Sequence, residues 1–306
     1  MREIAPGILM LDTRLGGWPG VTAAYLVAGE SPALVETGAR TSTATVIAAL
    51  REAGLGPGDL AWIVLTHVHL DHCGATGGVA AAFPRARVVV HPRGARHLAA
   101  PERLVAASAA VYGDLAPLYG GLDPTPEERI VPAGDGRRLA VGPGRDLVVL
   151  HAPGHARHHV AVLDEATGAV MAGDALGVRF PGGGLYPAVP PPEFDLEAAR
   201  RTLRRLAGLR PEALLLGHFG PAGEPAAALA LAERQQVLAA GAAERAWRRF
   251  GTVAAVDRAV RALLPPEGGV GDGPALSRWR ALRWIENNAA GLARWAAERA
   301  GAPTAL

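Results

Sequence analysis

The sequence contains no lysine, so its 31 basic residues are all arginine. A chain without lysine cannot form a Schiff base with a substrate, anchor pyridoxal phosphate or build the lysine-containing phosphate loop of nucleotide hydrolases. It has a single cysteine, which excludes an intrachain disulfide and any paired-cysteine redox or zinc site. Catalysis by this chain therefore has to use histidine, carboxylate, arginine or hydroxyl side chains.

Strong net charge and long apolar segments are also missing from the 306 residues. The basic residues are balanced by 29 acidic ones, which leaves a formal net charge of +2 and no basic stripe suited to nucleic acid. No uninterrupted run of about 18 apolar residues predicts a membrane helix. The first residues, Met1 to Pro6, lack the pattern of an export signal. We expect a cytoplasmic globular enzyme that binds a small-molecule substrate, and neither nucleic acid nor membrane.

Strand and helix patterns alternate over the first two-thirds of the chain. The first block of predicted strands is Ile8–Asp12, Val21–Ala28, Ser31–Glu36, Ala61–Leu65 and Ala86–His91. The second block is Arg138–Val141, Asp146–His151, His159–Leu163, Ala169–Ala172 and Ala213–Leu216. Helices are predicted at Thr41–Ala53, Thr76–Phe83 and Asp195–Ala207, and Gly94–Tyr112 is predicted to form one or two helices. Two similar blocks in succession predict two sheets packed face to face with helices outside.

The last part of the chain has an almost entirely helical pattern. Helices are predicted at Pro225–Phe250, Val253–Leu264 and Leu276–Ala300, so we expect two domains, residues 1–222 and 223–306. Four of the six tryptophans lie in this helical tail. A segment that concentrates large aromatic side chains packs against something. The tail covers the main domain, joins subunits of a homo-oligomer or lines a substrate pocket.

The strongest chemical signal follows the predicted strand Ala61–Leu65. The pattern H-x-H-x-D-H places His67, His69, Asp71 and His72 within six residues. Side chains alternate along an extended chain, so the first two histidines face the same side, and the aspartate and third histidine come at the turn into the next helix. This spacing offers two imidazoles to one ion and a carboxylate plus an imidazole to a second. Zinc-like ions bind such groups at about 2.0–2.1 Å.

Three later residues with ligand-forming side chains also follow predicted strands. They are His155, Asp174 and His218, and each has a glycine directly before it. Glycine lets the backbone approach other groups closely, and loops gather at one edge of a sandwich. We therefore expect these side chains to meet the histidine motif at that edge.

With these motifs in this order, the chain resembles the metallo-β-lactamase-fold hydrolases from about Ile8 to Pro221. Glu36-Thr37-Gly38 is similar to that family's early acidic-Thr-Gly turn, with glutamate where aspartate is commoner. The resemblance implies an α+β fold, a four-layer αββα metallo-β-lactamase-like sandwich, here followed by a helical C-terminal extension. It also implies a two-metal site at one edge of the sheets.

The resemblance further implies a role for each motif residue. His67, His69 and His155 are the implied ligands of the first metal. Asp71, His72 and His218 are the implied ligands of the second metal. Asp174 is the implied carboxylate that bridges both.

The expected cofactors are two divalent metal ions, zinc by preference, with iron or manganese as alternatives. Such a pair holds a bridging hydroxide at neutral pH, which would attack the substrate with Asp71 binding metal and orienting the nucleophile. The expected activity is zinc-dependent hydrolysis of a small-molecule ester, thioester or lactone. One alternative is a mononuclear iron persulfide dioxygenase of the same fold, and another is a non-catalytic scaffold.

Several neighbouring residues have expected supporting roles. A segment rich in glycine and proline follows the bridging aspartate and predicts a substrate wall or lid, so Arg179, Phe180 and Tyr186 are predicted to bind substrate. His159 is predicted to support the metal ligands from behind. Cys73 is predicted to point into the core as a small apolar group.

Overall fold

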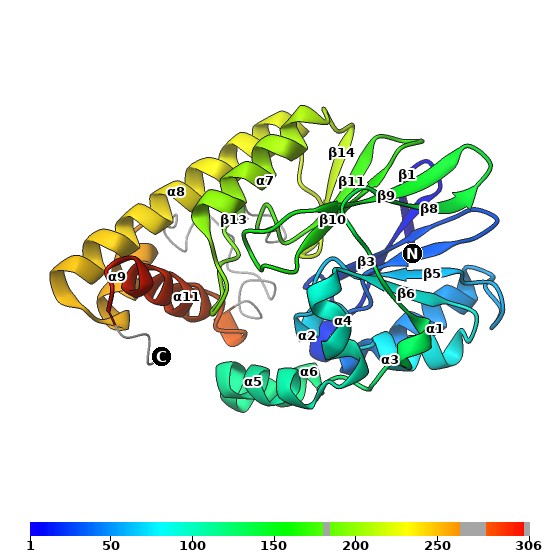
Figure 1. Ribbon diagram of the computed structural model, residues 1–306, viewed down its shortest axis with the longest axis horizontal. Coiled ribbons are helices and arrows are strands. Elements are labelled where there is room, and N and C mark those ends of the chain that lie inside the picture. Colours follow the sequence, from blue (N-terminus) through cyan, green and yellow to red (C-terminus); the bar gives the residue numbers. More distant parts are fainter. Residues whose placement is uncertain (180–183, 264–279, 303–306) are drawn as a thin grey trace.

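Two β-sheets packed face to face lie at the centre of the protein (Figure 1). The computed structural model describes residues 1–179, 184–263 and 280–302. The first sheet has seven strands in sequence order; β1 to β4 pair antiparallel and β4 to β7 pair parallel. These strands are β1 (Arg2–Ala5), β2 (Ile8–Asp12), β3 (Ala23–Val27), β4 (Ala33–Val35), β5 (Trp62–Val64), β6 (Arg87–Val90) and β7 (Ile130–Pro132).

The second sheet has six strands in the order β15-β14-β11-β10-β9-β8. Its neighbours pair antiparallel except for β11 and β14, which are parallel. These strands are β8 (Arg137–Gly142), β9 (Arg145–His151), β10 (Val160–Asp164), β11 (Ala169–Gly173), β14 (Ala213–Leu216) and β15 (Gly220–Pro221). A separate short hairpin, β12 (Val178–Arg179) and β13 (Leu185–Tyr186), stands where the sequence predicted only a loop.

Helices cover the outer face of each sheet, with α1 and α3 under β5 and β6, and α7 and α8 along β11 and β14 (Figure 1). On the side of the first sheet lie α1 (Thr43–Glu52), α2 (Leu70–Cys73), α3 (Thr76–Ala82), α4 (Pro92–Ala99), α5 (Glu102–Tyr112) and α6 (Ala116–Tyr119). On the side of the second lie α7 (Leu196–Gly208), α8 (Pro225–Phe250), α9 (Val253–Arg261) and α11 (Trp284–Arg299). Short 3-10 turns are η1 (Leu15–Gly17), η2 (Arg40–Ser42), η3 (Gly113–Leu115) and η4 (Glu127–Arg129). The predicted αββα layering is confirmed.

The interface between the two sheets is apolar. Alternate residues of the first sheet, such as Tyr25 and Val64, contact alternate residues of the second, such as Val149 and Met171, and all are buried. Burial of apolar area at about 25 cal/mol per Å² makes this interface the main source of stability of the sandwich. The alternation along each strand fixes which side chains face outward, where the helices pack.

The guanidinium of Arg145 links the second sheet to the N-terminal part of the first and also forms an ion pair within the second sheet. Nη2 of Arg145 lies 2.7 Å from Oδ2 of Asp164, whose side chain is fully buried. The same guanidinium donates to the carbonyl oxygens of Pro6 and Ala28, at 3.0 Å and 3.3 Å. This side chain therefore connects β9 to the residues just before β2 and just after β3, which lie side by side because the two strands are antiparallel.

Some predicted boundaries differ from the structure. The predicted helical stretch Gly94–Tyr112 is two helices that begin at Pro92 and Glu102, and Pro101 lies at the break because proline has no N–H to donate. Strands β1, β7 and β15 were missed, and all three are short strands at the edges of their sheets. The predicted helix Leu276–Ala300 lies partly outside the described residues. No helix in the described part of the chain combines the length and the apolar character that crossing a membrane requires.

Candidate metal centre

The segment after β5 brings two histidines of the motif to the edge of the first sheet. Residues 65–69 belong to no helix or strand, and His69, with φ of −70° and ψ of 146°, is the extended residue directly before α2. His67 is fully buried, and its Nδ1 lies 2.9 Å from Oγ1 of Thr66. Its Nε2 is also buried and has no hydrogen-bond partner. An unpaired buried nitrogen is costly unless something binds its lone pair.

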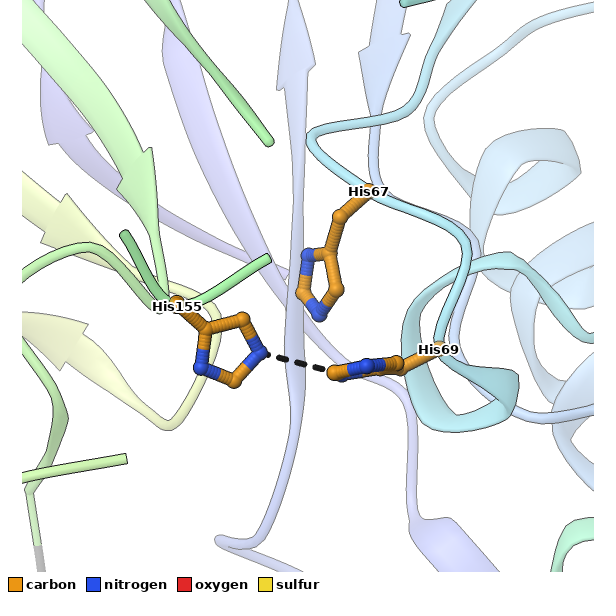
Figure 2. Close-up of side chains that lie close together, drawn as sticks. All are labelled: His67, His69 and His155. Atoms are coloured by element: carbon orange, nitrogen blue, oxygen red, sulfur yellow. Dashed lines mark hydrogen bonds between the residues drawn. The ribbon is translucent and has the colours of Figure 1, made fainter. Parts of the chain in front are cut away.

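A first group of ligand atoms forms where His155 joins these two histidines. One ring nitrogen from each of His67, His69 and His155 lies within 4.8 Å of the other two, and Figure 2 shows the three rings converging. Nδ1 of His155 donates to the carbonyl oxygen of Ala188 at 2.7 Å, because a carbonyl can only accept. Nε2 of His155, 3.0 Å from Nδ1 of His69, therefore carries a lone pair in the neutral ring.

A second group of ligand atoms consists of Asp71, His72 and His218. Nδ1 of His218 donates to the carbonyl oxygen of Val21 at 3.0 Å, so Nε2 of the neutral ring carries a lone pair. Nδ1 of His72 lies 3.1 Å from a carboxylate oxygen of Glu36. The two Nε2 atoms are 3.2 Å apart. Two facing lone pairs repel each other unless a proton or a metal ion lies between them.

Asp174 lies between the two groups. Its Oδ2 is 3.5 Å from Nε2 of His72, 3.6 Å from Nε2 of His218 and 3.8 Å from Nε2 of His155. Its Oδ1 is buried without a hydrogen-bond partner. The backbone N–H of Asp174 donates to Nε2 of His159 at 3.1 Å, so this histidine lies behind the carboxylate. One carboxylate thus faces imidazole nitrogens of both groups.

The two groups differ in their electrostatics. Burial lowers the pKa of each imidazole of the first group, His67, His69 and His155, which keeps these rings neutral with a free lone pair. Burial alone would also lower the pKa of His72, but the carboxylates of Asp174 and Asp71 raise it well above its usual value. Negative charge is therefore concentrated on the second group.

The donor set fits a bound divalent metal. Two buried atoms, His67 Nε2 and Asp174 Oδ1, lack hydrogen-bond partners, and the Nε2 atoms of His72 and His218 lie only 3.2 Å apart. Imidazole nitrogens with carboxylate oxygens suit zinc, iron or manganese. Glu36 is also within reach of this cluster, but its oxygens are engaged by the backbone N–H of Thr66 at 3.1 Å and by the ring of His72.

The centre opens into a cavity of about 540 Å³, part of it open to solvent. Its walls include Tyr112 and Tyr119, whose rings stack at 4.0 Å, and Trp284 and Asn287 of the C-terminal tail. None of these four was predicted as a site residue, although the concentration of tryptophan had marked the tail. Of the alternatives for the tail, the described part both packs on the main domain and lines this cavity.

Two of the three residues predicted to bind substrate, Arg179 and Tyr186, are among the described residues. Arg179 donates from Nη1 to the carbonyl oxygen of Pro221. Tyr186 packs edge-on against Trp284, at 5.6 Å between ring centres, and lines a neighbouring apolar cavity. Phe180 is outside the described residues. Among the described side chains that line the metal cavity, neither Arg179 nor Tyr186 is present.

The tail helix α11 also holds the segment that orients a candidate ligand. Oδ1 of Asn288 accepts from the backbone N–H of Val189 at 2.6 Å, and Nδ2 donates to the carbonyl oxygen of Pro187 at 3.2 Å. Between these two residues lies Ala188, the hydrogen-bond partner of His155. The position of this ring therefore depends on a residue more than a hundred positions further along the chain.

Comparisons with known proteins agree with this geometry. A family model described as the metallo-beta-lactamase superfamily matches residues 17–218. The metallo-beta-lactamase fold-containing protein ST1585 of Sulfurisphaera tokodaii is 29% identical over 165 residues, an alignment that covers 53% of this chain and 61% of that protein. This chain therefore spans less than two thirds of that relative in sequence.

Two solved structures share the fold over most of their length. The crystal structure of ST1585 matches with a TM-score of 0.69 and 23% identity, and covers 94% of this chain and 98% of its own. The metallo-beta-lactamase family protein TTHA1429 of Thermus thermophilus matches with a TM-score of 0.65 and 27% identity, and covers 96% and 94%.

Proposed function

The chain belongs to the metallo-beta-lactamase superfamily, and on that basis we propose that it is a dinuclear metal-dependent hydrolase of a small-molecule ester, thioester or lactone. The observation that carries this proposal is the position of Asp174. Its Oδ2 faces Nε2 of His155 on one side and Nε2 of His72 and His218 on the other, at 3.5 to 3.8 Å. A carboxylate in that position can serve two ions at once.

Each group of side chains would hold one ion, with zinc proposed for both. His67, His69 and His155 would bind the first, and Asp71, His72 and His218 would bind the second. When bound, such ions lower the pKa of a water molecule towards ~7 and polarise the oxygen atom of a substrate.

Asp71 is the proposed catalytic residue of the chain itself. Its side chain is 13% exposed, the most accessible of the second group, and it lines the cavity. Burial would raise the pKa of Asp71, but the nearby imidazoles of His72 and His218 hold it well below the usual range. An ionised carboxylate there can accept a hydrogen bond from the attacking water and orient it.

The walls of the metal cavity favour an uncharged substrate. No arginine occurs among the described residues that line it, whereas Leu15, Val178 and Leu282 add apolar surface to the aromatic rings. Apart from the proposed metal ions and their ligands, a phosphate or carboxylate group of a substrate would find no arginine among the described lining residues. This argues for a neutral ester, thioester or lactone over a nucleic acid.

Metal content measured together with hydrolysis tests the proposal. We expect about two zinc ions per chain by elemental analysis, turnover of a p-nitrophenyl ester, a thioester or a lactone, and no oxygen uptake. The variant Asp174→Asn should lose metal and turnover together, whereas Asp123→Asn, which removes a surface ion pair with Arg40, should keep both. One iron with persulfide-dependent oxygen uptake would favour the dioxygenase. A protein that retains no metal would favour the scaffold.

A further inference from the structure

A second cavity adjoins the metal cavity, and its walls come mainly from the C-terminal helices. We propose that this second cavity receives the apolar acyl chain of the substrate, so that the protein cleaves esters, thioesters or lactones that carry a medium-length or long aliphatic chain. This inference rests on the proposed hydrolase function. In this proposal the helical tail determines which substrates bind, because its helices line the cavity that receives the acyl chain.

The lining of the second cavity is predominantly apolar. Leu238 and Ala239 of α8, Val260 of α9 and Ile285 and Leu292 of α11 contribute to a space of about 500 Å³ that is partly open to solvent. The described lining residues include no charged side chain, and their polar members are Gln235, Asn288 and Tyr186. A site with this lining stabilises aliphatic groups and disfavours a charged group.

The mouth of the second cavity exposes apolar surface. Leu238 is 50% exposed and Leu263 is 43% exposed, although most large apolar side chains of the described residues are buried. Removing these side chains from water is favourable, and an aliphatic chain in the cavity would cover part of them. The exposed surface therefore complements an apolar ligand.

The two cavities meet at the start of α11. Trp284 and Asn288 line both of them. The amide of Asn288 is fixed by its hydrogen bonds to Pro187 and Val189, so it forms a rigid part of the boundary. In the proposed placement, a substrate with its carbonyl carbon beside Asp71 extends its chain past Trp284 into the second cavity.

The dependence of turnover on chain length tests this placement. For p-nitrophenyl esters from acetate to decanoate, kcat/KM should rise by up to about fourfold for each buried methylene. The variant Ala239→Phe, which fills part of the second cavity, should lower the ratio of kcat/KM for the decanoate ester to kcat/KM for the acetate ester at least tenfold. The control Val237→Phe changes a residue of the same helix that is 40% exposed and does not line the cavity, and it should leave both unchanged. A flat chain-length profile would overturn the inference.

Direct binding separates this inference from the proposed function. Titration calorimetry of the full chain should show the uncharged decanamide binding at least tenfold tighter than butanamide, and both Ala239→Phe and Ile285→Gln should weaken decanamide binding. Ile285 is only half-buried, so its variant is expected to fold. Decanamide binding without any esterase activity would support the cavity assignment and contradict the hydrolase function. Hydrolysis of short esters without decanamide binding would support the hydrolase function and overturn the cavity assignment.

Discussion

Glu36 shows how much of the centre depends on one buried residue outside the ligand set. Its backbone lies in the left-handed region, with φ at 69°, which costs a residue other than glycine about 1–2 kcal/mol. Its side chain is buried and its two oxygens bond the backbone N–H of Thr66 and the ring of His72. The strained backbone thus places the Glu36 carboxylate beside Nδ1 of His72, on the opposite side of the ring from Nε2.

Replacing this carboxylate by an amide should weaken metal binding. Glu36→Gln retains an oxygen for Thr66 but loses the negative charge beside His72, and loss of such a partner costs about 10–100-fold in metal affinity. Competition with a chelator would measure the change, and Glu30→Gln, at an exposed position, is the control. Identical chelator midpoints for Glu36→Gln and the native protein would contradict this role.

The single cysteine should be chemically silent in the folded protein. Cys73 is fully buried, and burial raises the pKa of its thiol well above the usual value. Only the thiolate reacts with disulfide reagents. Ellman's reagent should therefore detect no thiol in the native protein and one per chain in denaturant. Rapid labelling of the native protein would show that α2 opens readily.

At the scale of elements, the contact between α11 and the Pro187–Val189 segment connects the tail to the centre. Asn288→Ala removes both of its hydrogen bonds and leaves buried backbone groups unpaired, which should cost about 1–3 kcal/mol. Because Ala188 orients His155, we also expect weaker metal binding in the chelator assay. The adjacent residue Asn287 makes neither hydrogen bond to this segment. The control variant Asn287→Ala should therefore keep the native metal affinity.

A pair of glycines tests how closely α11 approaches this segment. A Cβ atom at Gly291 would lie 1.9 Å from the carbonyl oxygen of Val189, whereas at Gly241 of α8 it would meet only Nη1 of Arg245, at 3.3 Å. Alanine favours a helix interior over glycine by about 1 kcal/mol. Gly241→Ala should therefore be neutral or stabilising and Gly291→Ala destabilising, as measured by urea unfolding. Equal effects would mean that α11 does not pack closely there.

A structural feature could be predicted from the sequence when the residues that determine it lie close together along the chain. The positions of candidate ligands that follow strands, such as His67 and His218, could be predicted because strand pattern and motif lie side by side in the sequence. The contributions of Trp284 and Asn288 could not, since they depend on how α11 packs against a segment about a hundred residues earlier. The role of Glu36 was hidden for the same reason, because its neighbour His72 is brought to it only by tertiary structure.

At the scale of the whole molecule, the αββα architecture could be predicted from its two blocks of strands, but the buried ion pair of Arg145 could not. Arg145→Met leaves the carboxylate of Asp164 buried without its guanidinium, and should destabilise the protein by about 3–5 kcal/mol in urea unfolding. Arg138→Met, which removes surface pairs to Asp146 and Glu165, should cost at most about 1 kcal/mol. Similar costs for both variants would show that Arg145 is not a tie between the sheets.

The seven candidate ligands are divided between the two sheets. The motif from His67 to His72 follows β5 of the first sheet, whereas His155, Asp174 and His218 follow strands of the second. Neither half of the chain holds a complete coordination sphere. A growing chain would therefore gain the capacity to retain metal only after its second half had been synthesised and had docked, so that metal retention reports on completed assembly. Two fragments cut between the sheets would each be inert and would recover this capacity only on reassociation.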